Sequence, residues 1–429
     1  MGHEVWVANP ADVAAVIRAE PKYPKRFKNP LFDDFYKRHA KDPGVFFLND
    51  VEWQKQKRII SKKMLRPPQI NQYIPRINEV ATDMITRICH VRNDVGSDRS
   101  FEIDEIDMEL FKWSFETVTD FLFDRRFGSL EENPPPDSVA FIKAVGTFLD
   151  NVVAASLVPL KFYKYYKTKA FKAFNENFLM LYKYAEKLIA EKLDDIERRE
   201  ALGENLEDSQ ELIPFLLSSK QITNDEVGSS IVDTLFAGVD TTSNTMQWML
   251  YLLAKHPEVQ NRVREEVMHV FSDGAEPTVT NLQCIPFLKA TIKETLRLFP
   301  VLIVTGRVLP TDIVLSGYHI PANTSMMFLN HSMGRSEELF EDALSFKPER
   351  WLRDDSGDLP VDAFASLPFG FGVRMCLGRR LAELELQILL IKILLKFDLD
   401  LPPGHVVENH FRGTNIPDKP IRVKFLDRN

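Results

Sequence analysis

The sequence predicts a mainly α-helical protein with small β pieces. Apolar residues recur at i, i+3, i+4 and i+7 through most of the 429 residues, which is the period of a helix with one buried face. Strand-like alternation is confined to short segments, most of them near the C-terminus, and strands do not alternate with helices as in parallel α/β proteins. No stretch has the composition of a linker, so we expect one domain over residues 1–429.

The helical period is clearest in residues 79–91, 108–123, 138–154 and 169–200. The longest predicted helix begins after Thr223, where T-N-D-E forms a capping box, and continues to residue 256, where a proline ends it. At 1.5 Å per residue it is roughly 50 Å long. A helix of that length and apolar content must cross the core of a large domain.

Strand signals are few. Residues 5–7 alternate like a strand, and Asn9 and Pro10 then have the character of a helix N-cap and first helical residue. Residues 312–320 predict a hairpin that turns at a Ser-Gly pair, and residues 420–426 predict an edge strand.

Charge and cysteine content exclude several classes of protein. The chain has 54 Lys and Arg against 62 Asp and Glu, a net charge of −8, which argues against a nucleic-acid binder but leaves room for a local basic patch. The three cysteines are far apart and no C-x-x-C occurs, so neither a disulfide framework nor a zinc ribbon is expected. No run of about 18 apolar residues predicts a transmembrane helix, and no signal or transit peptide is visible.

The segment AGVDTTSNT, residues 237–245, is unusual inside the longest helix. Gly238 costs about 1 kcal/mol relative to alanine there, and four polar residues follow from Asp240. One interpretation is a water-facing turn, or a bend in which Ser and Thr bond back to the helix. The other is a local opening of the helix at Gly238, where Asp240 and Thr241 relay protons.

Charged residues of two other segments form a second pattern. Glu294 and Arg297 of KETLR lie three residues apart and share a helix face, which by itself is ordinarily a surface ion pair. Arg350 of FKPERW could join them in a buried cluster, but the spacing does not decide this.

The segment FGFGVRMCLG, residues 369–378, places one cysteine among three glycines and an arginine. A lone cysteine in a loop is ordinarily a small hydrophobic residue. Here the glycines permit a tight loop whose N–H groups can point at a thiolate, and Arg374 can pair with an anionic group of a cofactor. The combination predicts Cys376 as an iron ligand.

Together these motifs resemble those of the cytochromes P450, the heme-thiolate monooxygenases. The heme-binding loop of that family has the pattern F-x-x-G-x-R-x-C-x-G, filled here by Phe369, Gly372, Arg374, Cys376 and Gly378. AGVDTT resembles the oxygen-activation segment, ETLR supplies the family's E-x-x-R, and PERW its third charged partner. The resemblance implies the mainly α heme-thiolate fold with a small β-rich lobe, heme b as cofactor and O2 as co-substrate.

The resemblance also implies a role for each motif residue. Cys376 is the axial ligand of the heme iron, Asp240 and Thr241 supply protons during oxygen activation, and the structural ion cluster is Glu294, Arg297 and Arg350. The residues that hold the heme are Cys376, Arg374, Trp53, Lys57, Phe369, Gly370 and Gly378. Lys57 is a departure, because the family's W-x-x-x-R has arginine there. Lysine pairs as a point charge and not through two parallel bonds, so Arg374 is expected to carry more of the pairing with the heme propionates.

A finer resemblance, carried by VDTTSNT, GRRLAELE and FLKATIKETLRLFP, is to mitochondrial sterol and vitamin D side-chain hydroxylases. It implies an acidic, adrenodoxin-like [2Fe–2S] ferredoxin as electron donor, docking on Lys289, Lys293, Arg379 and Arg380, which could otherwise be ordinary surface charges. It also implies a sterol or steroid substrate in a pocket lined by Phe236, Val239, Val301, Val304 and Phe148, the last of which could equally be core.

Location and extent follow from the same resemblance. Residues 157–171 interleave aromatic residues with lysines, which suits either a surface loop with snorkelling lysines or peripheral contact with a membrane. We expect the second, at the mitochondrial inner membrane, and a monomer. The chain begins later than the family usually does, and we expect the targeting segment, first helix and first strand to be absent.

Two other functions keep part of this site. One is a heme-thiolate isomerase or dehydratase that does not use O2, against which Asp240 and Thr241 argue, because it has no need of protons for oxygen activation. The other is a non-catalytic protein that binds heme or a sterol.

Overall fold

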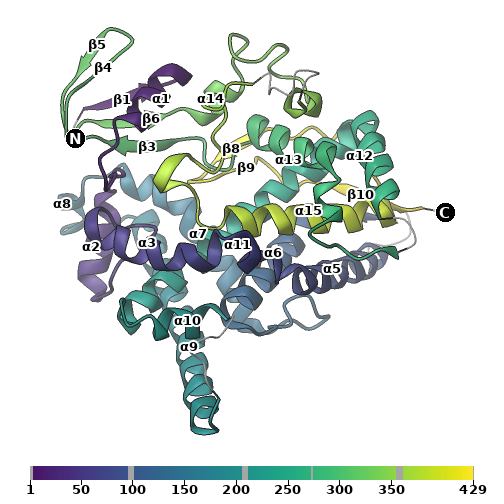
Figure 1. The fold of residues 1–429 in the computed structure, drawn as a ribbon, viewed down its shortest axis with the longest axis horizontal. Coiled ribbons are helices and arrows are strands. Elements are labelled where there is room, and N and C mark those ends of the chain that lie inside the picture. Colours follow the sequence, from purple (N-terminus) through teal and green to yellow (C-terminus); the bar gives the residue numbers. More distant parts are fainter. Residues whose placement is uncertain (1–2, 95–100, 205–210, 272–273, 354–360, 429) are drawn as a thin grey trace.

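The computed structural model describes residues 3–94, 101–204, 211–271, 274–353 and 361–428. These are mainly helical, as predicted, and Figure 1 shows strands β1 and β3–β6 gathered in a small lobe beside the N-terminus. The helices are α1 (Pro10–Arg18), α2 (Pro30–His39), α3 (Asp50–Met64), α4 (Pro67–Asn71), α5 (Ile74–Asp94), α6 (Ile106–Phe123), α7 (Pro136–Ser156), α8 (Leu160–Tyr163), α9 (Lys169–Ala201), α10 (Leu212–Ser218), α11 (Asn224–Lys255), α12 (Pro257–Val270), α13 (Pro286–Leu298), α14 (Asn330–Gly334) and α15 (Arg379–Lys396). Short 3-10 turns are η2 (Asn281–Gln283), η3 (Pro348–Trp351) and η4 (Gly372–Arg374).

The strands of the described residues form four small sheets. The first has the order β1 (Glu4–Val7), β6 (Ser325–Phe328), β3 (Thr305–Val308), and the second the order β2 (Glu102–Ile103), β10 (Val423–Asp427), β7 (Phe397–Asp400). The hairpins are β4 (Ile313–Leu315) with β5 (Tyr318–Ile320), and β8 (Asn409–Phe411) with β9 (Asn415–Pro417). The 312–320 hairpin is therefore confirmed. The prediction of an edge strand near the C-terminus is wrong, because β10 pairs with a strand on each side.

The long helix α11 passes through the centre of the fold, between α6 and α15 (Figure 1). Its predicted capping box is present, with Thr223 and Glu226 bonded to each other's backbone N–H groups. The predicted opening at Gly238 is wrong, because α11 is helical throughout. A Cβ on Gly238 would lie 2.8 Å from Cγ2 of Val118 in α6. The glycine is needed for close packing of the two helices.

Most of the chain shares one large hydrophobic core built on α5, α6, α7, α9, α11 and α15. A second, smaller core lies under the β lobe between α1 and β3–β6, and includes Val13, Leu315 and Phe328. Among the described helices, α7 is long and apolar enough to cross a membrane, by length and composition only. The sequence pattern predicted a helix here, but not one long and apolar enough to cross a membrane. In the fold α7 packs against α9 and buries Phe141 and Phe148, as a core helix does.

Candidate functional site

The loop before α15 has the tight geometry that its glycines allow. Gly370 and Gly372 both have φ of 69°, a left-handed conformation that side chains disfavour. The N–H of Cys376 donates to the carbonyl of Phe369 at 2.9 Å and closes the loop. A Cβ on Gly378 would lie 3.9 Å from the Sγ of Cys376. The loop therefore presents the sulfur with little beside it.

The thiol of Cys376 lies at the N-terminus of α15, deep in the fold. Burial raises the pKa of Cys376, while the N–H groups of Gly378 and Arg379 and the positive charge of Arg26 lower it. The residue is nevertheless accessible to solvent. A sulfur held by two N–H groups at a helix N-terminus is suited to binding metal as a thiolate.

Arg374 is buried. Its guanidinium donates hydrogen bonds to uncharged acceptors, and no carboxylate of the described residues balances its charge. Its Nε donates to the carbonyl of Pro24 at 2.9 Å, its Nη1 to that of Leu48 at 3.0 Å, and its Nη2 to Oδ1 of Asn49 at 2.5 Å. Its guanidinium lies 3.8 Å from the centre of the Trp53 ring. Among the described residues it forms no ion pair. Burial, followed by the charges of Arg26 and Arg307, lowers the pKa of Arg374 to about 8.

Two arginines that the sequence did not single out lie beside Arg374. Arg26 donates to the carbonyl of Arg374 at 2.8 Å, and burial followed by the charge of Arg307 lowers the pKa of Arg26 to about 10. Arg307, on β3, pairs with Glu20. We call Arg26, Arg307 and Arg374 the open cluster. Among the described residues, only one of these three cations, Arg307, has a carboxylate partner, and that partner is Glu20. Neither new arginine lies in a motif, so no local signal could have identified it.

Lys57 lies on α3 at the edge of the open cluster. Its Nζ is 6.0 Å from the centre of the Trp53 ring, and burial lowers the pKa of Lys57. It forms no ion pair with any residue that the structure describes. Lys57 and Arg374 both approach the ring of Trp53, and the pairing of Lys57 with a propionate stays a prediction.

These groups fit heme b. Cys376 would bind the iron. The open cluster and Lys57 would pair with the two propionates, which would supply the negative charge that the cluster lacks. When bound, heme supplies the redox chemistry of oxygen activation. The protein contributes the ligand, the cations and the groups on α11.

Asp240 on α11 is buried and paired through one oxygen. Arg412, in the turn of the β8–β9 hairpin, donates to Oδ1 of Asp240 at 3.1 Å and also contacts Asp150 at 3.1 Å. Oδ2 of Asp240 has no hydrogen-bond partner. Burial raises the pKa of Asp240, while the charge of Arg412 and the nearby polar side chains of Thr414 and Asn244 lower it. No local pattern points to Arg412, which lies 172 residues away from Asp240 in the chain.

The hydroxyl groups that follow Asp240 bond back to the helix. Thr241 donates to the carbonyl of Ala237 at 2.8 Å, Ser243 to that of Val239 at 2.6 Å, and Thr245 to that of Thr241 at 2.8 Å. This matches the back-bonded interpretation of the sequence. Thr241 is half-buried and directly follows Asp240 in α11, and a proton relay through the two stays a prediction.

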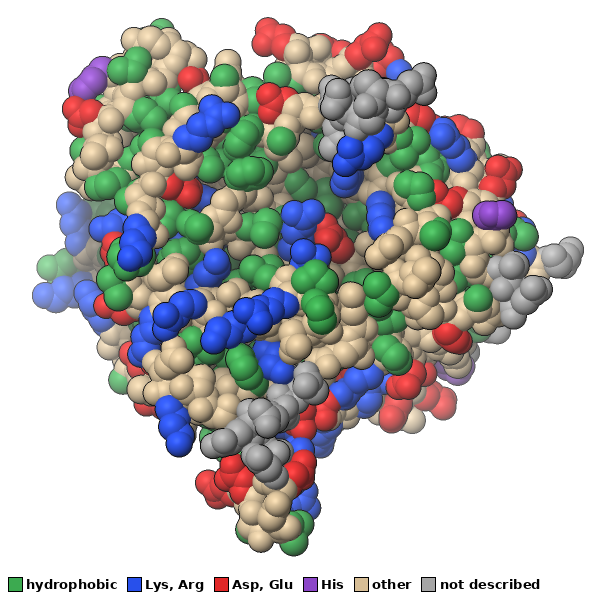
Figure 2. All heavy atoms as spheres, in the orientation of Figure 1, with side chains coloured by type: hydrophobic (Ala, Val, Ile, Leu, Met, Phe, Trp, Pro, Cys, Tyr) green, Lys and Arg blue, Asp and Glu red, His purple; other side chains and the backbone are tan. Residues whose placement is uncertain are grey.

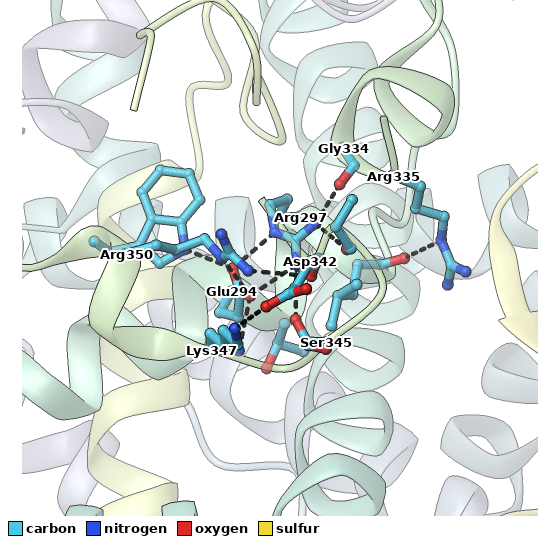
Figure 3. A network of polar contacts seen from close by, with 12 residues as sticks. Glu294, Arg297, Gly334, Arg335, Asp342, Ser345, Lys347 and Arg350 are labelled. Carbon is cyan, nitrogen blue, oxygen red and sulfur yellow. Dashed lines mark hydrogen bonds and ion pairs between the residues drawn. The ribbon is translucent and has the colours of Figure 1, made fainter. Parts of the chain in front are cut away.

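The cluster of Glu294, Arg297 and Arg350, by contrast, is complete (Figure 3). Arg297 binds both oxygens of Glu294, at 2.7 and 2.8 Å, and Arg350 binds Oε1 at 2.9 Å. The backbone N–H of Lys347 and the indole of Trp351 also donate to Glu294. Glu294 and Arg297 are fully buried, which selects the buried cluster over the surface ion pair. We call it the closed cluster.

Comparison with known proteins decides the family. A family model described as cytochrome P450 matches residues 2–425. The chain belongs to the cytochrome P450 family. It is 33% identical to the human mitochondrial sterol 26-hydroxylase over 423 residues, 96% of this chain and 78% of that protein. It is 33% identical to the bovine mitochondrial cholesterol side-chain cleavage enzyme (98% and 79%), and 29% identical to the mouse mitochondrial 1,25-dihydroxyvitamin D(3) 24-hydroxylase (99% and 79%).

In this P450 the residues predicted to line the substrate pocket are mostly buried. Phe148 stacks on Phe178 with ring centres 4.8 Å apart, and Phe236 meets Phe148 at 5.9 Å. Val239 and Val301 are buried and Val304 is half-buried. These contacts favour core for Phe148, the alternative left open by the sequence. A pocket role for the others stays a prediction.

The predicted docking residues of this P450 share one surface. Burial is the largest cause that lowers the pKa of Lys293. The positive charges of Arg379, Lys289 and Arg353 lower it as well, so these residues lie near Lys293. Arg379 pairs with Glu383 at 2.9 Å. Lys289, Lys293 and Arg380 form no ion pair among the described residues. Figure 2 shows Lys and Arg side chains gathered around a hollow on this face, over α13 and the start of α15.

Proposed function

We propose that the chain is a mitochondrial P450 domain that hydroxylates a sterol or steroid with O2 and electrons from a [2Fe–2S] ferredoxin. The observation that carries the proposal is the pair of Asp240 and Thr241 on α11. Asp240 keeps one buried oxygen without a partner and Thr241 is next to it. A buried acid beside a hydroxyl can pass protons inward, which a hydroxylase needs during oxygen activation and an isomerase or dehydratase does not.

The proposed substrate class rests on chemistry and on relatives. The segments predicted to face the substrate are apolar, and the three relatives compared above are named for sterol, cholesterol or vitamin D substrates. All three are also named as mitochondrial, which supports that location here. The free cations on α13 and α15 support docking of an acidic ferredoxin through charge complementarity.

Peripheral membrane contact is proposed through the segment at α8. Leu157, Tyr165 and Tyr166 are 71%, 83% and 73% exposed, and Lys161 and Lys164 lie between them. Large exposed apolar side chains with lysines suit the interface between lipid headgroups and acyl chains. We propose that this segment contacts the mitochondrial inner membrane. We also propose that the protein is a monomer.

The test begins with the carbon monoxide difference spectrum of the reduced, heme-loaded protein. A strongly red-shifted Soret band is expected from thiolate ligation, and should be lost in Cys376→Ser. A panel of sterols is then screened for a shift of spin state, and binders are incubated with ferredoxin, its reductase and O2. Hydroxylated product that requires both oxygen and reductant supports the proposal. Product formed without either indicates an isomerase or dehydratase, and a normal Soret band with no product indicates a binding protein.

A further inference from the structure

A surface groove of about 350 Å³ lies beside the basic residues of α13 and α15. It runs between α4, the start of α5, the segment around η2, α13 and α15. Its lining residues are Pro67, Ile70, Asn71, Ile74, Val279, Leu282, Gln283, Lys289, Arg380, Glu383, Leu384 and Gln387. The volume is that of a small binding pocket. The docking proposed above uses two of its lining residues, Lys289 and Arg380, but not the groove itself.

The groove has an apolar floor and a cationic rim. Ile70, Ile74 and Leu282 are buried beneath it, whereas Val279 at its edge is 43% exposed. The rim carries Lys289 and Arg380, which have no ion-pair partner among the described residues. Its acid, Glu383, is already paired with Arg379 at 2.9 Å. The groove therefore offers apolar contact surrounded by uncompensated positive charge.

The groove also lies close to the iron ligand along the chain. Arg380, Leu384 and Gln387 are on one face of α15, and Arg380 is four residues after Cys376. The lining from Arg380 to Gln387 spans the first two turns of α15, roughly 10 Å at 1.5 Å per residue. A protein seated in the groove would lie against the helix end that holds the sulfur, which is where an electron donor has to approach.

We infer that the groove receives an apolar side chain of the ferredoxin, one flanked by carboxylates that meet Lys289 and Arg380. The inference rests on the proposed function and adds a second component to docking. Attraction between exposed charges is screened as salt rises. Burial of an apolar side chain is not weakened in this way. Docking therefore has a part that persists at high salt, and the groove supplies that part.

The experiment measures binding of oxidised [2Fe–2S] ferredoxin to the heme-loaded protein by calorimetry, at low and at high salt. Gln283→Trp fills the groove with a bulky side chain and leaves every charge in place. Gln221→Trp, at an exposed glutamine outside the groove, is the matched control. Val279→Ser removes apolar surface at the edge and provides a second variant in case the tryptophan disturbs the fold. Lys289→Glu tests the charged component.

With the wild type, measurable affinity should persist at high salt, and binding should carry a negative heat-capacity change. Gln283→Trp should weaken binding about tenfold at both salt concentrations, Val279→Ser should lower the salt-resistant part, and Gln221→Trp should leave both unchanged. Lys289→Glu should weaken binding mainly at low salt.

Two results overturn the inference, and they are distinguishable. If Gln283→Trp and Val279→Ser bind ferredoxin as the wild type does at both salt concentrations, the groove is not used and the proposed partner stands. If the wild type shows thiolate ligation but binds no ferredoxin at any salt concentration, the proposed partner fails, and the groove inference fails with it.

Discussion

The closed cluster and the open cluster each contain buried arginines, but their charges are balanced differently. In the closed cluster, Arg297 and Arg350 converge on the two oxygens of one fully buried carboxylate. In the open cluster, Arg374 has carbonyl and amide acceptors and no acid, and Glu20 pairs with Arg307 alone. Buried charge is costly unless it is paired. Removing one partner from a complete buried cluster destabilises the fold, whereas we propose that the cluster that lacks negative charge binds an anionic ligand.

The largest effect should come from opening the closed cluster. Glu294→Gln leaves Arg297 buried without its counter-charge, and should lower the free energy of unfolding by about 3–5 kcal/mol, with or without heme. Denaturant unfolding followed by circular dichroism measures this. Arg125→Gln, which removes an exposed ion pair with Glu191, is the control and should have no measurable effect. Equal stability of the two variants would show that burial of the closed cluster contributes little.

The next effect should come from removing a charge from the open cluster. Arg374→Gln should increase the rate of heme loss about tenfold or more, since groups that support a bound cofactor commonly have effects of this size. Transfer of heme to an apo-hemoprotein scavenger measures the rate. Loss of stability should be much greater in the heme-loaded than in the heme-free protein, unlike Glu294→Gln. An equal loss in both forms would make Arg374 a structural residue like Arg297.

A smaller effect should come from strengthening the open cluster. Lys57→Arg replaces a point charge by a planar fork that can bind a carboxylate through two bonds. It should slow heme loss by a few-fold, because a charged hydrogen bond contributes about 1.5–3 kcal/mol only when its geometry is good. The same scavenger assay tests this, with Arg58→Lys on the neighbouring exposed residue as control. A faster loss would show that Lys57 does not face the propionates.

The smallest effect should come from the half-paired acid on α11, which is intermediate between the two clusters. Burial raises the pKa of Asp240 and Arg412 lowers it, so Arg412→Gln should raise this pKa further, by about 1 unit. Asp240 would then become ionised at higher pH, and the acid limb of the profile of product formed per electron pair should move to higher pH by a similar amount. Asp150→Asn keeps the cation and should leave the limb near its wild-type position. An unshifted limb in Arg412→Gln would assign it to another group.

Features set by neighbours in the chain could be predicted. The capping box of α11, the turn at Ser316-Gly317 and the tight, glycine-containing loop before α15 are all found as predicted. Features that depend on what packs against an element were less predictable. Gly238 suggested an opened helix, but Val118 of α6 lies against it, and the C-terminal strand β10 is central because β2 pairs with it from far away in the sequence.

The sequence alone determined the mainly α class, the family's motifs and the cysteine predicted to bind the heme iron, because helical period, caps and loop geometry are local properties. Only the tertiary structure decided which charged side chains lie beside a partner of opposite charge. Arg26 reaches Arg374 across 348 residues, and Arg412 reaches Asp240 across 172. Neither arginine carries a local sign of its partner. Coulomb interaction and burial depend on distance in space, and that distance is fixed only when the fold brings the segments together.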